Sequence, residues 1–202
     1  MKEEKNKHFE FDRGAYLRRI DFAGDTSPTV ENLKALHHAH FHGIPFENFD
    51  ILLGRGIDLA PGAMFDKLVR NRRGGYCFEL NGLFLMALKA FGFDARALLA
   101  RTHVTGLPTG RGHQISLVTI GGSRWIVDVG FGGDTPRGPV PLQSDKVTTH
   151  EGQKIRLKET ERFGTMLQTV KNGDWADLYS FDLEYVCQAD IDYGNHFNAK
   201  ER

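Results

Sequence analysis

Cysteine is scarce in this chain of 202 residues, with only Cys77 and Cys187 present. Two cysteines so far apart do not form the framework of a small disulfide-rich domain, and the Cys-x-x-Cys spacing of many zinc sites is absent. Each cysteine is therefore assessed as a single thiol, by the residues around it.

An excess of charge of either sign is also absent, because 26 Lys and Arg residues balance 26 Asp and Glu residues. The basic surplus typical of a nucleic-acid-binding module is missing, so we expect no nucleic acid partner. No apolar run reaches the length that spans a membrane, and the charged N-terminal segment lacks the apolar core of a signal peptide. Composition thus predicts a soluble cytoplasmic protein with no membrane partner.

Hydrophobic periodicity divides the chain into a helical first part and a strand-rich second part. The segment FELNGLFLMALKAFGF repeats its apolar residues at helical spacing. After it, HQISLVTI and SRWIVDV are strand-like, and Asn172-Gly173 between two further strand-like runs is typical of a hairpin turn. We therefore predict an α+β fold, with an N-terminal helical bundle over residues 1–92 and an antiparallel β-barrel over 93–202 that ends in the start of an interdomain segment.

Cys77 stands where a helix is predicted to begin, directly after Gly74-Gly75-Tyr76. A helix N-terminus offers free N–H groups and partial positive charge, which favour a thiolate and can bind a developing oxyanion. Cys77 is therefore a candidate nucleophile, although a small buried cysteine is the alternative. Cys187 lies in the strand-like run LEYVCQAD and is predicted to be structural.

A nucleophilic cysteine needs a base, and His113 and Asp128 are candidates for the base and the group that orients it. If Gly121-Gly122 forms a two-residue hairpin loop, Ile120 pairs with Ser123. The side chains of His113 and Asp128 then lie on the same face of the sheet as diagonal neighbours, whereas a slip of one residue would separate them. A structural histidine and an aspartate bound to backbone N–H groups are the alternatives.

Four histidines, His37, His38, His40 and His42, cluster in one predicted helix. His37 and His40 are three residues apart and could share a face, which makes a metal site conceivable. No carboxylate or thiol follows them at the usual ligand spacing, so no metal is predicted.

Several segments together resemble the arylamine N-acetyltransferase family. RRGGYCFELNGLF (Arg72–Phe84) is similar to the family's nucleophile signature, and TVENLKALHHAHFHGIPFENFDILL is similar to its N-terminal helix and Pro-Phe-Glu-Asn segment. RGHQISLV and WIVDVGFGG carry the histidine and the aspartate at the expected places. The match runs in order from about Tyr16 to Asn195, so the chain is identified as a member of this family.

The resemblance implies a Cys-His-Asp triad of Cys77, His113 and Asp128 in a cysteine-protease-like core. It implies acetyl-CoA as acyl donor, an arylamine or arylhydrazine as acceptor, ping-pong kinetics and a role in xenobiotic metabolism. Phe46 and Phe131 match aromatic walls of the acceptor pocket, with core packing as the alternative. Thr109 and Gly110 match positions near the thioester end of CoA.

Members of the family usually continue for roughly another third of this length, into a C-terminal α/β domain that acts as a lid. This chain ends at IDYGNHFNAKER, so we expect it to be acylated but to transfer the acyl group poorly and lose it to water.

The same triad could also serve a hydrolase, a transglutaminase-like enzyme or an amide synthase, and a non-catalytic CoA-binding or metal-binding module is a further alternative. The sequence leaves the acyl chain, the natural amine and the oligomeric state open.

Overall fold

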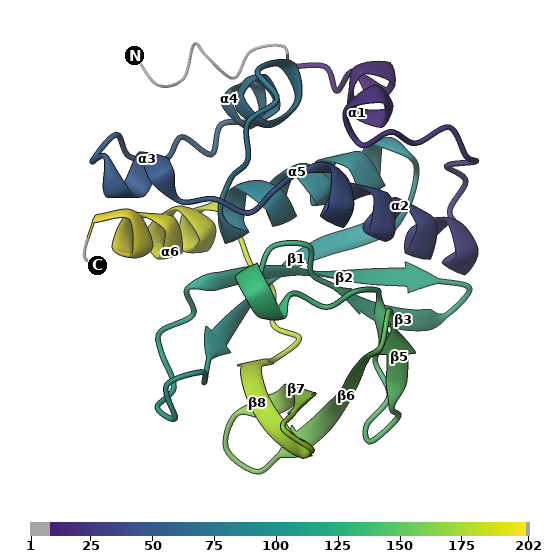
Figure 1. Ribbon diagram of the computed structural model, residues 1–202, viewed down its shortest axis with the longest axis vertical. Helices are drawn as coiled ribbons and strands as arrows, with labels where there is room; N and C mark the ends of the chain where they lie inside the picture. The colour runs from purple at the N-terminus through teal and green to yellow at the C-terminus, as the bar shows by residue number, and fades with distance from the viewer. Residues whose placement is uncertain (1–8, 201–202) are drawn as a thin grey trace.

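The computed structural model describes residues 9–200, so the charged segment 1–8 and the last two residues of the predicted second domain lie outside it. Figure 1 shows the helices gathered over one side of a curled sheet. The helical elements are α1 (Arg13–Arg19), α2 (Val30–Gly43), α3 (Phe49–Leu52), α4 (Pro61–Phe65), η2 (Asp66–Arg70), α5 (Cys77–Ala90), η3 (Gly132–Asp134) and α6 (Gln188–Lys200).

The strands form one antiparallel sheet in the order β4-β3-β2-β1-β8-β7-β6-β5. They are β1 (Asp94–Thr102), β2 (His113–Ile120), β3 (Ser123–Val127), β4 (Val140–Pro141), β5 (Thr148–His150), β6 (Gln153–Thr160), β7 (Gly164–Lys171) and β8 (Asp174–Phe181). Helices precede the strands as predicted from periodicity, but the chain forms a further helix, α6, after the sheet, which the periodicity did not predict.

Both predicted hairpin turns are present. Ile120 pairs with Ser123 across Gly121-Gly122, whose φ angles of 55° and 79° are the left-handed values that a two-residue turn of this kind requires. Asn172 and Gly173, also at positive φ, connect β7 to β8. The first turn fixes the register of β2 against β3, which decides the face on which the side chains of this hairpin lie.

The sheet curls until its two ends approach each other, with β4 against β6 and a bridge between Ser144 and Leu157. One group of buried apolar side chains fills the inside of the curl, among them Leu98, Ile115 and Leu167. A second group joins the helices to the outer face of β1 and β2. The structure thus contains helices and a nearly closed antiparallel sheet; the bundle arrangement, the protease-like core and the boundary near residue 92 stay predictions.

Helix α5 lies between the other helices and the sheet, and it packs on β1 and β2 (Figure 1). Its side chains are buried on nearly every face, including Leu80, Phe84 and Leu88. A helix surrounded in this way is held rigidly, and so is the residue at its first position. Within residues 9–200, no helix is both long and apolar enough to cross a membrane.

Candidate active site

Cys77 is the first residue of α5, as predicted, and its side chain is buried with 9% of the residue surface exposed. Its sulfur lies 4.0 Å from the carbonyl oxygen of Gly112, the residue before His113. The helix start is fixed by the Glu79 carboxylate, which accepts a hydrogen bond from the Tyr76 backbone N–H at 3.1 Å. The sulfur therefore sits beside the free N–H groups of the first turn.

Gly74 and Gly75, which precede Tyr76 and Cys77, let the backbone lie close against the Pro-Phe-Glu-Asn segment. The Gly75 carbonyl accepts from the Glu47 N–H at 2.9 Å, and the Gly75 N–H donates to the Pro45 carbonyl at 3.2 Å. A Cβ atom on Gly74 would lie only 2.3 Å from the Pro45 carbonyl oxygen. These glycines are thus needed for close backbone approach at the entrance to α5.

A network of ion pairs, most of them buried, links the first turn of α5 to the segments that precede it. The Lys67 ammonium lies 2.8 Å from both Glu79 and Asp50, and Arg73 binds Asp50 and Glu47 at 2.9 and 2.7 Å. Burial raises the pKa of Glu79, and Lys67 opposes that rise. The hydrogen bond from Lys67, more than any other contact, lowers the pKa of Asp50 to about 2. Paired charges in this position fix the loop before Cys77 and the first turn of α5 relative to each other.

His113 and Asp128 lie on the same face, as the hairpin register predicted. The His113 Nε2 atom is 2.8 Å from Asp128 Oδ2, and both residues are almost completely buried. His113 begins β2, while Asp128 follows the last residue of β3, Val127, which pairs with Ser116. Because Nε2 faces the carboxylate, Nδ1 is the ring nitrogen that remains for an exchange of protons with Cys77.

The ionised pair is favoured by its surroundings. Burial by itself lowers the pKa of His113, but the charge and hydrogen bond of Asp128, together with Cys77, raise it to about 10. Burial opposes ionisation of Asp128, but His113 and hydrogen bonds from Gly130 and Asn81 hold its pKa below the ordinary value. An imidazolium facing Cys77 is therefore the expected form of the ring at neutral pH.

Asn81 holds the aspartate in place and was not identified from the sequence. Its amide Nδ2 donates to Asp128 Oδ1 at 2.9 Å, and its Oδ1 accepts from the Val129 N–H at 2.9 Å. The Gly130 N–H also donates to Asp128 Oδ1, at 2.9 Å. Asn81 lies four residues after Cys77 on α5, so the two residues share a face of the helix, but nothing in the sequence links Asn81 to Asp128.

His37 and Tyr179 also contact this site without having been assigned to it. The His37 Nε2–H donates to the Asp128 backbone carbonyl at 2.9 Å, and burial lowers the pKa of His37 to about 4, so the ring is neutral. The Tyr179 ring lies 5.2 Å from that of His113. Burial and the nearby Asp128 charge raise the pKa of Tyr179 far above its ordinary value, so its hydroxyl stays protonated.

The two aromatic residues predicted for the acceptor pocket lie at the site. The Phe131 ring meets that of His113 edge-on, at 4.9 Å between centroids. Phe46 is 45% exposed, and its ring approaches the position of a Cβ on Gly132 at 4.0 Å. The Phe46 backbone pairs with Gly75, next to the start of α5, while Phe131 packs partly against the buried group inside the sheet. Their role in an acceptor pocket stays a prediction.

Thr109 and Gly110 lie in the loop between β1 and β2. The Thr109 hydroxyl accepts from the Thr102 N–H at 3.0 Å and donates to the Gly110 carbonyl at 2.9 Å. The loop continues to Gly112, whose carbonyl accepts from Asn198 of α6 at 2.5 Å. This loop therefore leads directly to Cys77 and His113.

Replacing Asn81 with alanine is expected to destabilise the fold by about 1–3 kcal/mol, because a buried N–H and a buried carboxylate lose a partner. The midpoint of urea unfolding measures this loss. The matched control is Asn32→Ala, since the hydrogen bonds of Asn32 are exposed and water can replace them. Equal midpoints for both variants would show that Asn81 contributes no more than a surface residue.

The chain is similar to known proteins over nearly its whole length. The family described as N-acetyltransferase matches residues 29–202. The arylamine N-acetyltransferase / N-hydroxyarylamine O-acetyltransferase of Salmonella typhimurium is 43% identical over 188 residues, which cover 92% of this chain and 66% of that protein. The chain thus spans just under two thirds of that relative's length.

Solved structures agree with the sequence comparison. The Salmonella typhimurium arylamine N-acetyltransferase superposes with a TM-score of 0.90 at 41% identity, covering 95% of this chain and 70% of the other. The Mycobacterium marinum arylamine N-acetyltransferase in complex with CoA gives a TM-score of 0.88 at 37% identity, covering 93% and 71%.

Proposed function

Since the chain belongs to the arylamine N-acetyltransferase family, we propose that it carries an acetyl group from acetyl-CoA to the nitrogen of an arylamine or arylhydrazine by way of Cys77. The observation that carries the proposal is the buried His113–Asp128 pair beside a cysteine at a helix N-terminus. A core histidine with a purely structural role would not need an ionised partner next to a thiol.

The first half-reaction acetylates the enzyme. The Cys77 thiolate attacks the thioester carbonyl carbon, and the N–H groups at the start of α5 bind the oxyanion that forms. When the carbon–sulfur bond of acetyl-CoA breaks, the leaving CoA thiolate takes the proton of the His113 imidazolium and departs as a thiol. Cys77 then carries the acetyl group, and His113 is neutral.

The second half-reaction transfers the acetyl group to the amine. The amine nitrogen attacks the carbonyl carbon of acetyl-Cys77, and neutral His113 removes its proton. The carbon–sulfur bond to Cys77 breaks, which restores the thiolate and the imidazolium. Aromatic amines suit this step because they are uncharged at neutral pH and can stack on Phe131 and Phe46.

We assign Thr109 and Gly110 to the thioester end of CoA. Their loop ends beside Cys77 and His113, and a side chain added at Gly110 would meet no atom within 4 Å, so the surface there is open to a ligand. Backbone groups of such a loop can bind the polar arm of a long substrate. The relative from Mycobacterium marinum was solved in complex with CoA, which supports a CoA substrate for this chain.

Free CoA is expected to appear before any amine is present. One equivalent of CoA thiol per protein should be released rapidly after acetyl-CoA is mixed with the chain, because the donor leaves before the acceptor reacts. Rapid acid quenching followed by chromatographic measurement of free CoA measures this burst. Release that requires an arylamine would contradict the acetyl-cysteine route.

The slow phase after the burst separates the remaining activities. Continued CoA release without amine measures hydrolysis of acetyl-Cys77, and acetylated arylamine measures transfer. Many turnovers of hydrolysis with no acetylated product, for a panel of arylamines and hydrazines, would favour a hydrolase. Repeating the burst with longer acyl-CoA donors defines the acyl group that the site accepts.

A further inference from the structure

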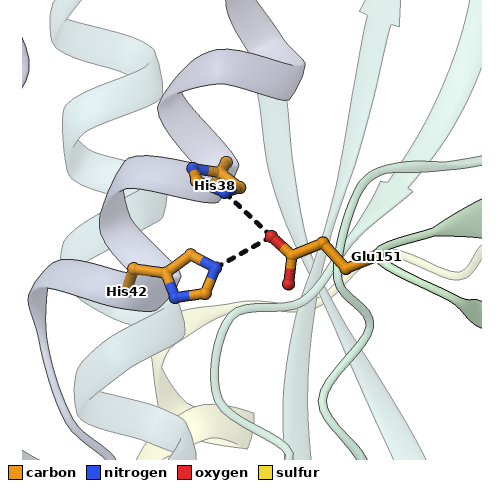
Figure 2. Close-up of side chains that lie close together, drawn as sticks. All are labelled: His38, His42 and Glu151. Carbon is orange, nitrogen blue, oxygen red and sulfur yellow. Dashed lines mark hydrogen bonds and ion pairs between the residues drawn. The ribbon is translucent and has the colours of Figure 1, made fainter.

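A second group of chemically active side chains lies where helix α2 faces the turn between β5 and β6. His38 and His42 are four residues apart, so they project from the same side of α2, and about half of each side chain is exposed. Glu151 reaches them from the turn: its Oε1 atom is 2.8 Å from His38 Nε2 and 2.9 Å from His42 Nε2 (Figure 2).

Figure 2 shows both rings directing a nitrogen at one carboxylate oxygen. The ring centroids are 4.4 Å apart, and the ligand atoms of all three residues lie within 4.8 Å of one another. In this group, which we name the His38–His42–Glu151 cluster, two nitrogen atoms and one oxygen atom converge on one small volume. That is the donor set of many zinc sites.

The positions of these residues are fixed by rigid parts of the backbone. His38 and His42 lie within a continuous helix, and Glu151 lies in a two-residue turn closed by the pairing of His150 with Gln153. Glu151 has a φ of 47°, a left-handed value at which glycine, asparagine and aspartate are the favoured residues. A glutamate kept in this conformation points to a role for its side chain.

We propose that the His38–His42–Glu151 cluster binds one divalent transition-metal ion, with zinc as the best fit. Imidazole nitrogens favour zinc and its neighbours over magnesium or calcium, which prefer oxygen ligands alone. Zinc bonds of about 2.0–2.2 Å in tetrahedral geometry place ligand atoms about 3.3–3.5 Å apart. The Glu151 oxygen reaches that spacing by moving about 0.5 Å away from each ring nitrogen, which an exposed side chain does by small rotations.

The ion would connect the helical layer to the end of the sheet. β5 lies at one edge of the sheet and pairs only with β6. The bound ion would join the turn between β5 and β6 to helix α2. The fourth ligand position is left to water, because these three are the only described side chains that converge there. The cluster shares no residue with the Cys77 site, so the ion acts as a structural clip and takes no part in acetyl transfer.

Zinc binding tests the proposal directly. Because Cys77 and His113 could themselves bind zinc, titrations use the full chain with Cys77→Ser, after dialysis against a chelator. Calorimetry is expected to give one saturable zinc site in the micromolar range or tighter, and the melting temperature should rise with zinc concentration. Cobalt in place of zinc should give the intense visible absorption of a four-coordinate site.

Single substitutions locate the ion. His38→Gln, His42→Gln and Glu151→Gln are each expected to weaken binding about tenfold or more, because each removes a ligand. Glu151→Gln keeps a hydrogen-bond acceptor for the histidines, so the metal-free protein should melt as before. The matched control is His196→Gln, an exposed histidine on α6, which should leave zinc binding unchanged.

Two results would overturn the proposal. Absence of saturable binding below millimolar zinc would mean that the cluster is only a hydrogen-bonded surface group. Binding of unchanged strength in the Glu151→Gln and His38→Gln variants would place the ion elsewhere in the protein.

Discussion

Substituting serine for Cys77 is expected to lower arylamine acetylation by about 10⁴- to 10⁶-fold, the range seen when an enzyme loses its nucleophile. A serine hydroxyl is far less acidic than a thiol, so the imidazolium of His113 does not generate an alkoxide at neutral pH. The volume hardly changes and Cys77 is buried, so the fold should be retained. The loss then measures chemistry at the sulfur and not stability.

Intact mass spectrometry gives the decisive measurement. The wild-type chain mixed with acetyl-CoA should gain the mass of one acetyl group, and the Cys77→Ser variant should gain none. Cys187→Ser is the matched control, because Cys187 is partly exposed, precedes the first residue of α6 and has no contact with His113 or Asp128 among the described residues. An acetyl adduct that persists without Cys77, or disappears without Cys187, would refute the assignment of the nucleophile.

Replacing Asp128 with asparagine should slow acetylation of Cys77 by about 10³- to 10⁴-fold. Asp128 Oδ1 accepts hydrogen bonds from Asn81 and Gly130, so the oxygen of an asparagine side chain must occupy that position. Its NH₂ group then faces His113 Nε2, which has to become a hydrogen-bond acceptor. The proton of a neutral ring consequently moves to Nδ1, the nitrogen facing Cys77, and the ring cannot accept the thiol proton.

The same substitution should also change the pH dependence. In the wild-type chain the pKa of His113 is about 10, so the ring is charged at neutral pH and loses its proton only as the pH rises through that value. Without the carboxylate, burial still lowers the pKa of His113 and only Cys77 still raises it, so the ring should lose its proton at a lower pH than in the wild-type chain. The rate of Cys77 alkylation by iodoacetamide, measured from pH 5 to pH 10, reports the difference.

Asp134→Asn is the matched control for this experiment, because Asp134 binds the exposed Lys171 and has no contact with His113. Its alkylation profile should match that of the wild-type chain. A profile for Asp128→Asn that also matched the wild type, with acetylation slowed less than about tenfold, would show that the carboxylate does not control the ring.

Local spacing was sufficient to predict the relation between His113 and Asp128. They are 15 residues apart in one hairpin, and the glycine pair at its turn fixes which residues face each other. The start of α5 at Cys77 was predictable for a similar reason, because the glycines and the change to helical periodicity are adjacent in sequence. In both cases the geometry of a single element or turn determines the positions of the side chains.

Spacing within one element could not predict the contacts of Asn81, His37 and Glu151. Asn81 meets Asp128 across 47 residues and His37 meets it across 91, so each contact depends on how a helix packs on the sheet. The prediction that the histidine cluster binds no metal rested on the absence of a nearby carboxylate. Glu151, 109 residues beyond His42, supplies one because α2 and the β5–β6 turn are adjacent only in the folded chain.

The sequence by itself determined the family, the helical first part and the strand-rich second part, and the residues proposed for acetyl transfer, since these depend on motifs and periodicities within short segments. The tertiary structure decided which groups support Asp128 and which carboxylate faces His38 and His42. Such contacts arise when the apolar faces of α2 and α5 are buried against other elements, and that packing depends on all the elements together.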